Sequence, residues 1–175
     1  MNQDLQRLQR AIAYGLRGLD SAQTQLRPRS LRERWSIQQI VEHLLLTYSS
    51  TETTIDTRLE KRSPTRAKPG PMQHIGQYTV IRLGYFPHGR KAPSMVTPAA
   101  TQTPLSGEAL TLSASEHLQR LDALFDEAEE LFGAARCASH HVLGPLSIFQ
   151  WRRFHLVHGG HHVRQILAIR KIHGV

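Results

Sequence analysis

The 175-residue sequence contains a single cysteine, Cys137, and lacks any apolar run long enough to cross a membrane. One cysteine excludes an intrachain disulfide framework and fits a reducing compartment. The N-terminus, MNQDLQRLQR, also lacks the apolar core of a secretory signal peptide. We therefore expect a cytoplasmic protein that forms a single domain over residues 1–175, a length that suits one hydrophobic core.

Nucleic-acid-binding motifs are also missing, although the chain is basic, with a formal net charge of +8 and a pI of about 10.4. It has neither a zinc-finger spacing nor an aromatic-basic strand signature, and its basic residues are spread through every segment. Such a charge favours anionic partners: nucleic acid, an acidic membrane surface or a carboxylate-bearing small molecule. Solubility alone also explains it. We expect a small-molecule substrate and no membrane partner, with nucleic acid as a weak alternative.

Four amphipathic segments predict four long helices, because their apolar residues recur at helical spacing. The first covers residues 3 to about 26. The second begins at Ser36, the third runs from Ser113 to about Ala135, and the fourth runs from Ser147 to about Lys171. Each of these three starts with a capping box, in which Ser is followed three residues later by Glu or Gln.

Residues 61 to about 112 hold seven of the nine prolines, so no long helix is expected there. Structureless loops of this length are unusual inside a compact domain. We interpret the stretch as a crossover over one end of the domain, with a short helix or strand within residues 73–85. A long crossover allows helices two and three to be parallel. The expected fold is all-α: a four-helix bundle in up-down-down-up order, with the crossover between helices two and three.

The predicted fourth helix carries four of the eleven histidines, His155, His158, His161 and His162. On a helical wheel His155, His158 and His162 lie on the core-facing stripe, whereas His161 points about 100° away from His162. His158 and His162 are spaced i, i+4, so two imidazoles can converge on one metal ion. Core histidines bonded to backbone or carboxylates are the alternative, since a buried imidazole needs a partner. His155 can line the pocket as an acid–base group or simply pack in the core.

A third ligand must come from another helix, and His43 on the second helix is the best candidate. Three histidines leave one coordination position open, which is typical of catalytic rather than structural zinc sites. Gly159 and Gly160 stand in mid-helix, where each costs roughly 1 kcal/mol relative to alanine. They are either tolerated or required by the close approach of another backbone or a ligand.

Two stretches resemble the DinB/YfiT-like superfamily: W-S-I-Q-Q-I-V-E-H-L at 35–44 and H-G-G-H-H-V-R-Q-I at 158–166. The stretch L-G-P-L-S-I-F-Q-W-R-R-F-H at 143–155 is similar to one branch of that superfamily. The resemblance implies a divalent metal ion, Zn²⁺ or Ni²⁺, held by His43, His158 and His162. The paired glycines in mid-helix depart from the pattern.

The superfamily includes metal-dependent S-transferases that use low-molecular-weight thiols. By resemblance we expect a metal-dependent enzyme of the thiol S-transferase type. We also expect a homodimer. A hydrolase that activates metal-bound water is a close variant, because the same open position serves either nucleophile. The second class is a non-catalytic metal-binding or stress-response bundle that acts by association. The absence of a clear general base favours this second class.

Overall fold

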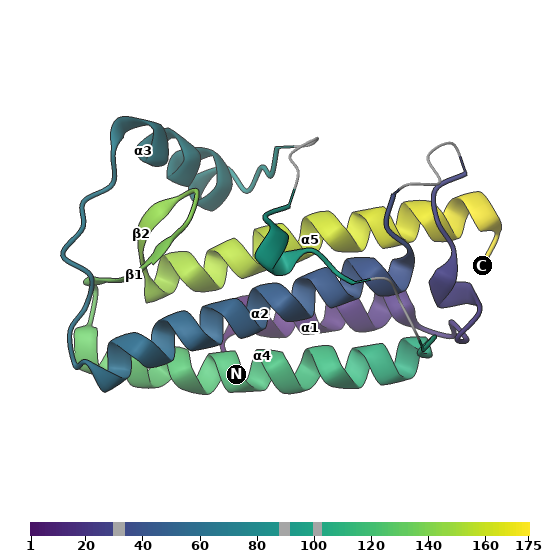
Figure 1. Cartoon of the computed structure of the whole chain (residues 1–175), viewed down its shortest axis with the longest axis horizontal. Helices are drawn as coiled ribbons and strands as arrows, with labels where there is room; N and C mark the ends of the chain where they lie inside the picture. The colour runs from purple at the N-terminus through teal and green to yellow at the C-terminus, as the bar shows by residue number, and fades with distance from the viewer. Residues whose placement is uncertain (30–33, 88–91, 100–102) are drawn as a thin grey trace.

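Four long helices make up most of the molecule (Figure 1). The computed structural model covers the whole chain and describes residues 1–29, 34–87, 92–99 and 103–175. The long helices are α1 (Gln3–Leu16), α2 (Ile37–Glu60), α4 (Gly107–Phe132) and α5 (Ile148–His173). The prediction of a predominantly helical chain is confirmed. None of the helices in the described ranges is both long and apolar enough to cross a membrane.

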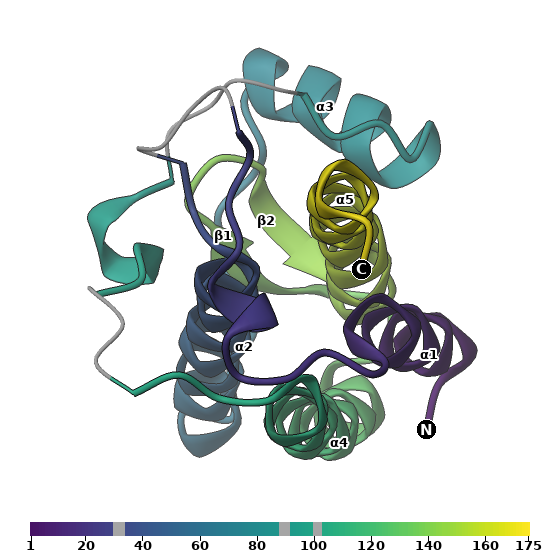
Figure 2. The same ribbon diagram turned by 90° about the vertical axis from the view of Figure 1, so that its right-hand side faces the viewer.

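Shorter elements connect the long helices. They are the 3-10 turns η1 (Gln23–Gln25) and η3 (Ser94–Val96), helix α3 (Pro71–Gln77), the π-helical turn η2 (Tyr78–Arg82), and strands β1 (Arg136–His140) and β2 (Gly144–Ser147). The two strands form an antiparallel hairpin in which Ala138 pairs with Leu146. Figure 2 views the molecule end on and shows α3 outside the four long helices, next to α5.

Contacts between the long helices establish their directions. Gln38, near the start of α2, donates to the Thr103 carbonyl just before α4, and Glu52 further along α2 accepts from His117 in α4. These two helices are therefore parallel. Similar pairs of contacts make α1 parallel to α5 and antiparallel to α4. The long segment between α2 and α4 is what returns the chain to the end where α2 began.

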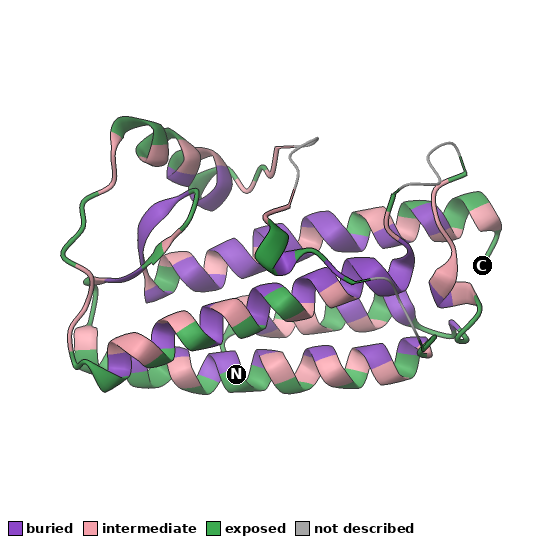
Figure 3. Ribbon diagram, in the orientation of Figure 1, coloured by how far each residue is buried: buried purple, intermediate pink, exposed green. Residues whose placement is uncertain are grey.

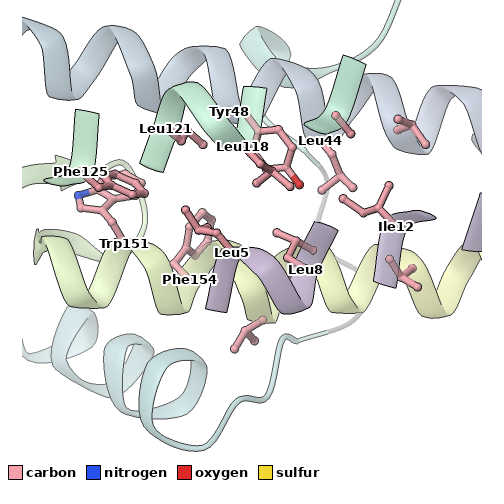
Figure 4. Close-up of a cluster of buried hydrophobic side chains, with 14 of the residues drawn as sticks. Leu5, Leu8, Ile12, Leu44, Tyr48, Leu118, Leu121, Phe125, Trp151 and Phe154 are labelled. Atoms are coloured by element: carbon pink, nitrogen blue, oxygen red, sulfur yellow. The ribbon is translucent and has the colours of Figure 1, made fainter. Parts of the chain in front are cut away.

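The four long helices enclose a continuous apolar core, and the sequence-predicted faces point into it (Figure 3). Each helix contributes large side chains that are essentially inaccessible to solvent. The cluster in Figure 4 includes Leu5, Leu8, Ile12, Leu44, Tyr48, Leu118, Leu121, Phe125, Trp151 and Phe154. Burial of this apolar surface is the main force holding α2 and α5 in register.

Two predicted helix boundaries, the end of the first helix and the start of the third, are wrong. α1 ends at Leu16 rather than near residue 26, because Gly18 adopts a left-handed φ of 73° that takes the chain out of the helix. α4 begins at Gly107, six residues before the predicted start, with the Ser106 hydroxyl accepting from Ala109 N. Ser113 instead lies inside the helix and donates to the Ala109 carbonyl.

The predicted all-α fold has no strand before the fourth helix, but the chain forms the β1–β2 hairpin there. Its sequence lacks the alternation that identifies strands, and the turn depends on Gly144, whose φ of 68° favours glycine. The short element expected in the crossover is α3 followed by η2. This segment is fixed to the hairpin by Gln77, whose side-chain amide donates to the Leu143 and Pro145 carbonyls.

Candidate metal centre

Three histidines that are far apart in the sequence meet where α2 passes α5. His43 Nε2 lies 3.2 Å from His158 Nε2, and His162 Nε2 lies 3.1 Å from the same atom. One nitrogen from each of the three falls within 4.8 Å of the others. All three side chains are buried, with relative exposures of 4–6%. The structure therefore brings together the three residues that the sequence singles out.

Local sequence sets the start of each helix and hence the position of each ligand. A capping box between Ser36 and Gln39 starts α2, and a second one between Ser147 and Gln150 starts α5. Both were predicted and both are confirmed. The ring of Trp35, just before the first box, packs 4.9 Å from the His43 ring and covers it from outside.

Hydrogen bonds to carbonyl oxygens identify which nitrogen of two of the rings carries the proton. His43 Nδ1 lies 2.7 Å from the Val96 carbonyl oxygen, and His162 Nδ1 lies 2.8 Å from Gln165 Oε1. A carbonyl oxygen only accepts, so each Nδ1 donates, and each Nε2 presents its lone pair to the centre of the cluster. Such outward donors are what orient histidine ligands in metal sites.

The three neutral imidazoles cannot satisfy one another's hydrogen-bonding needs. A neutral His158 has one N–H and can donate to His43 Nε2 or to His162 Nε2, but not to both. The Nδ1 of His158 is itself buried and has no hydrogen-bond partner among the described residues. A cation at the centre accepts all three lone pairs at once, so this donor set fits a divalent ion that favours nitrogen ligands.

Burial keeps all three candidate ligands in their neutral form. Desolvation lowers the pKa of His43, although its bond to the Val96 carbonyl opposes the change. Burial lowers the pKa of His162 to about 3, and nearby His43 adds to this effect. Burial also holds the pKa of His158 well below its usual value, with further lowering from His162 and His43. Neutral imidazole is the form that binds a metal ion, so the site is ready for one at neutral pH.

The other two histidines of the fourth-helix cluster have different surroundings. His155 is completely buried among aromatic rings, including Tyr48 and Trp151, and neither ring nitrogen has a hydrogen-bond partner among the described residues. It lies in the core beside the site and outside the group of converging ligands. His161 also lies outside this group, as its direction on the wheel predicts, but its Nε2 bonds the side-chain amide of Gln165.

Further histidines occur in the crossover and in the hairpin. His74 is exposed on α3, and His88 lies outside the described residues. His140 belongs to the hairpin, where its Nδ1 accepts from the backbone N–H groups of Val142 and Leu143.

The two mid-helix glycines differ from each other. A Cβ on Gly159 would collide with the Leu8 side chain of α1, whereas one on Gly160 would have ordinary contact with the Arg164 side chain alone. Close approach therefore explains Gly159, and the approaching group is a side chain of α1. Nothing in the packing of the described residues requires Gly160.

Several residues that shape the site were missed by sequence reasoning. The Val96 carbonyl gives no sequence signal, because any residue type supplies one. Gln165 does have a signal, since it lies three residues after His162 and four after His161, spacings at which helix side chains meet. Aromatic rings also cover the cluster: Phe154 stacks on His158 at 5.3 Å, and Phe86 lies 4.9 Å from the same ring.

Comparison with known proteins adds nothing to this geometry. No protein-family model matches the sequence, and neither the curated proteins nor the solved structures contain a significant match.

Proposed function

We propose that the chain is a metal-dependent enzyme of the DinB/YfiT-like type, with a four-helix bundle in up-down-down-up order as its scaffold. His43, His158 and His162 would hold one Zn²⁺ or Ni²⁺ ion, and the reaction would be of the thiol S-transferase kind. One observation carries the proposal: three buried Nε2 lone pairs, from two helices, converge within 4.8 Å without enough donors to satisfy them. A cytoplasmic homodimer acting on a low-molecular-weight thiol completes the proposal.

A divalent ion in this position supplies positive charge that lowers the pKa of a thiol or water at its open coordination position. The protein's own residues orient the ligands and limit access of water. Val96 and Gln165 hold the rings of His43 and His162 with their lone pairs inward. Phe86 and Phe154 pack on His158 and form an apolar wall. His155, three residues before His158, remains the candidate acid–base group.

A specific observation favours the non-catalytic alternative, in which the protein binds metal and acts by association. The hydrogen bonds of His43, His158 and His162 within the described residues go to a backbone carbonyl, an amide and one another, and none goes to a carboxylate. His155 is therefore the candidate general base in a catalytic role. A hydrolase would use the same open position with water as the nucleophile.

Metal analysis of the purified protein tests the site. We expect about one divalent ion per chain, lost in His158→Ala and in His43→Ala, and retained in His74→Ala, which changes an exposed histidine of α3. A wild-type protein that binds no divalent ion would refute the site. A panel of thiols with electrophilic acceptors then separates the functions: metal binding without turnover favours the non-catalytic alternative.

A further inference from the structure

The crossover between α2 and α4 carries charge of one sign only. No aspartate or glutamate occurs between Glu60 and Glu108, and every charged side chain between them is a lysine or an arginine. Basic residues are spread through the whole chain, but in the other long segments carboxylates accompany many of them. The crossover is therefore a concentrated positive segment on a basic protein.

Within this segment, α3 and η2 have one buried and one exposed side. The buried side includes Val80 and Ile81 and is anchored to the hairpin by Gln77. The exposed side is unusually apolar. Met72 is 77% exposed, and Ile75 and Tyr78, which follow it at intervals of three residues, are 60% exposed. Leu83, directly after η2, is 61% exposed. Together with the exposed Arg82 we call these residues the outer face.

The outer face stands clear of the four long helices. Figures 1 and 2 show α3 as the outermost element on its side of the molecule, and Figure 3 shows its exposed side directed away from the body. Lys68 and Arg66 are exposed just before α3, and Arg82 is exposed within η2. No ion pair in the described part of the chain involves these three cations. Their charge is thus available to a partner.

The partner must offer negative charge and accept large apolar side chains together. A second copy docking through the same face would bring cations against cations, which a two-fold symmetric contact cannot avoid. An anionic lipid surface meets both requirements, because headgroups attract lysine and arginine while the interface accepts Met, Ile, Leu and Tyr side chains.

We propose that the outer face binds the surface of bilayers containing anionic phospholipid. The segment lies on the surface, inserting Met72, Ile75, Tyr78 and Leu83, while Lys68 and Arg82 contact phosphate groups. Two turns of helix bury little apolar area, so the association is reversible and weakens as salt screens the charges. This proposal differs from the expectation of no membrane partner, which rested on the sequence alone; the sequence does not show which side of this segment is exposed.

Vesicle co-sedimentation tests the proposal. We expect the full-length protein to sediment with vesicles of phosphatidylcholine and phosphatidylglycerol at low salt, and to be released at high salt. Vesicles of phosphatidylcholine alone should retain much less. Equal binding to both kinds of vesicle, or no binding to either, would overturn the proposal.

Matched variants locate the contact. Lys68→Gln with Arg82→Gln should lower partitioning onto anionic vesicles roughly thirtyfold, whereas Arg10→Gln in α1 with Arg17→Gln directly after it, a change of two exposed cations, should alter partitioning little. Ile75→Gln should also weaken binding, in contrast to Leu112→Gln on α4, whose side chain has a similar exposure of 61%. Outer-face variants that bind like their controls would refute the assignment.

Two further measurements distinguish membrane binding from self-association and from metal binding. Sedimentation velocity should give the same oligomeric state for wild type and Ile75→Gln. A shift between oligomeric states in that variant would identify a protein–protein surface and contradict the proposal. His158→Ala should bind vesicles as wild type does, because the outer face does not include the metal ligands, so either proposal can fail alone.

Discussion

The chemistry of the candidate site depends on single atoms, namely which nitrogen of each imidazole carries a hydrogen. Gln165 connects the ring of the ligand His162 to that of its neighbour His161, since its Oε1 accepts from His162 Nδ1 and its Nε2 lies 3.1 Å from His161 Nε2. Removing this partner leaves the His162 Nδ1–H without an acceptor and frees the ring to rotate. The ligand would then be poorly oriented for a metal ion.

We therefore predict that Gln165→Leu weakens Zn²⁺ affinity by roughly 10–100-fold, the typical effect of losing a partner that orients a ligand. A competition titration against a chromophoric chelator measures this. Gln119→Leu, an exposed change on α4, is the control and should keep the wild-type affinity. Unchanged affinity in Gln165→Leu would show that this hydrogen bond does not position His162.

Buried histidines also make stability depend on pH. Burial lowers the pKa of His155 to about 3, and burial with nearby His141 and His155 lowers the pKa of His140 to about 3. In the unfolded chain a histidine has a pKa near 6.5, so below that value the unfolded state binds more protons. The stability that these two histidines contribute by being neutral in the fold is therefore fully present above about pH 6.5 and is lost as the pH falls towards 3.

For the metal-free protein, we predict that each of these two histidines makes the free energy of unfolding fall by up to about 1.4 kcal/mol for each pH unit lost within this window. When urea unfolding is measured at several pH values in EDTA, His155→Leu should remove the part of the pH dependence of the unfolding free energy that comes from His155. Ile12→Val, a core change without a titrating group, should lower stability equally at every pH. An unchanged slope in His155→Leu would mean that this ring is not buried in its neutral form.

At the scale of elements, the sequence predicted the cores of the helices better than their ends. The starts of α2 and α5 were predicted because both signals, a capping box and an apolar period, coincide there. The start of α4 was placed too late because Ser113 imitates a cap, while the actual cap, Ser106, precedes a glycine. At Gly107 a Cβ would clash with the Leu16 carbonyl, so tertiary packing explains the glycine and local sequence does not.

Residues of the candidate site likewise differ in how far the sequence indicates them. His158 and His162 could be predicted because their spacing is fixed by the helix, whereas no spacing connects His43 to them, and it is predicted only as the best candidate on another helix, with support from the resemblance. The Val96 carbonyl could not be predicted, since its position depends on how the crossover lies against α2.

The adjacent glycines of α5 provide a test of packing between elements. Gly159→Ala should destabilise the protein by about 1–3 kcal/mol, because the methyl group must displace the buried Leu8 of α1. Gly160→Ala should instead stabilise it by about 0.5–1 kcal/mol, because the site is open and alanine favours the helix. Urea denaturation of the two variants measures both values. Effects of the same sign would contradict the close approach of α1 and α5 at Gly159.

At the scale of the whole molecule, the three ligands join two helices that are separated by most of the chain. His43 and His158 are 115 residues apart in sequence, and the crossover, α4 and the hairpin lie between them. In the unfolded chain the three ligands are dispersed, so they cannot bind one ion together. Metal binding must therefore stabilise the folded state by mass action.

We predict that Zn²⁺ at 100 times its dissociation constant stabilises the fold by about 2.7 kcal/mol, which raises Tm by roughly 5–10 °C for a chain of this size. His43→Ala should abolish this increase as completely as His158→Ala, because each removes a ligand from one of the two helices. His74→Ala should keep it. Thermal unfolding followed by circular dichroism, with and without Zn²⁺, measures the change. If His43→Ala retained the full increase, the ion would be bound by α5 alone, and the site would not connect the two halves of the molecule.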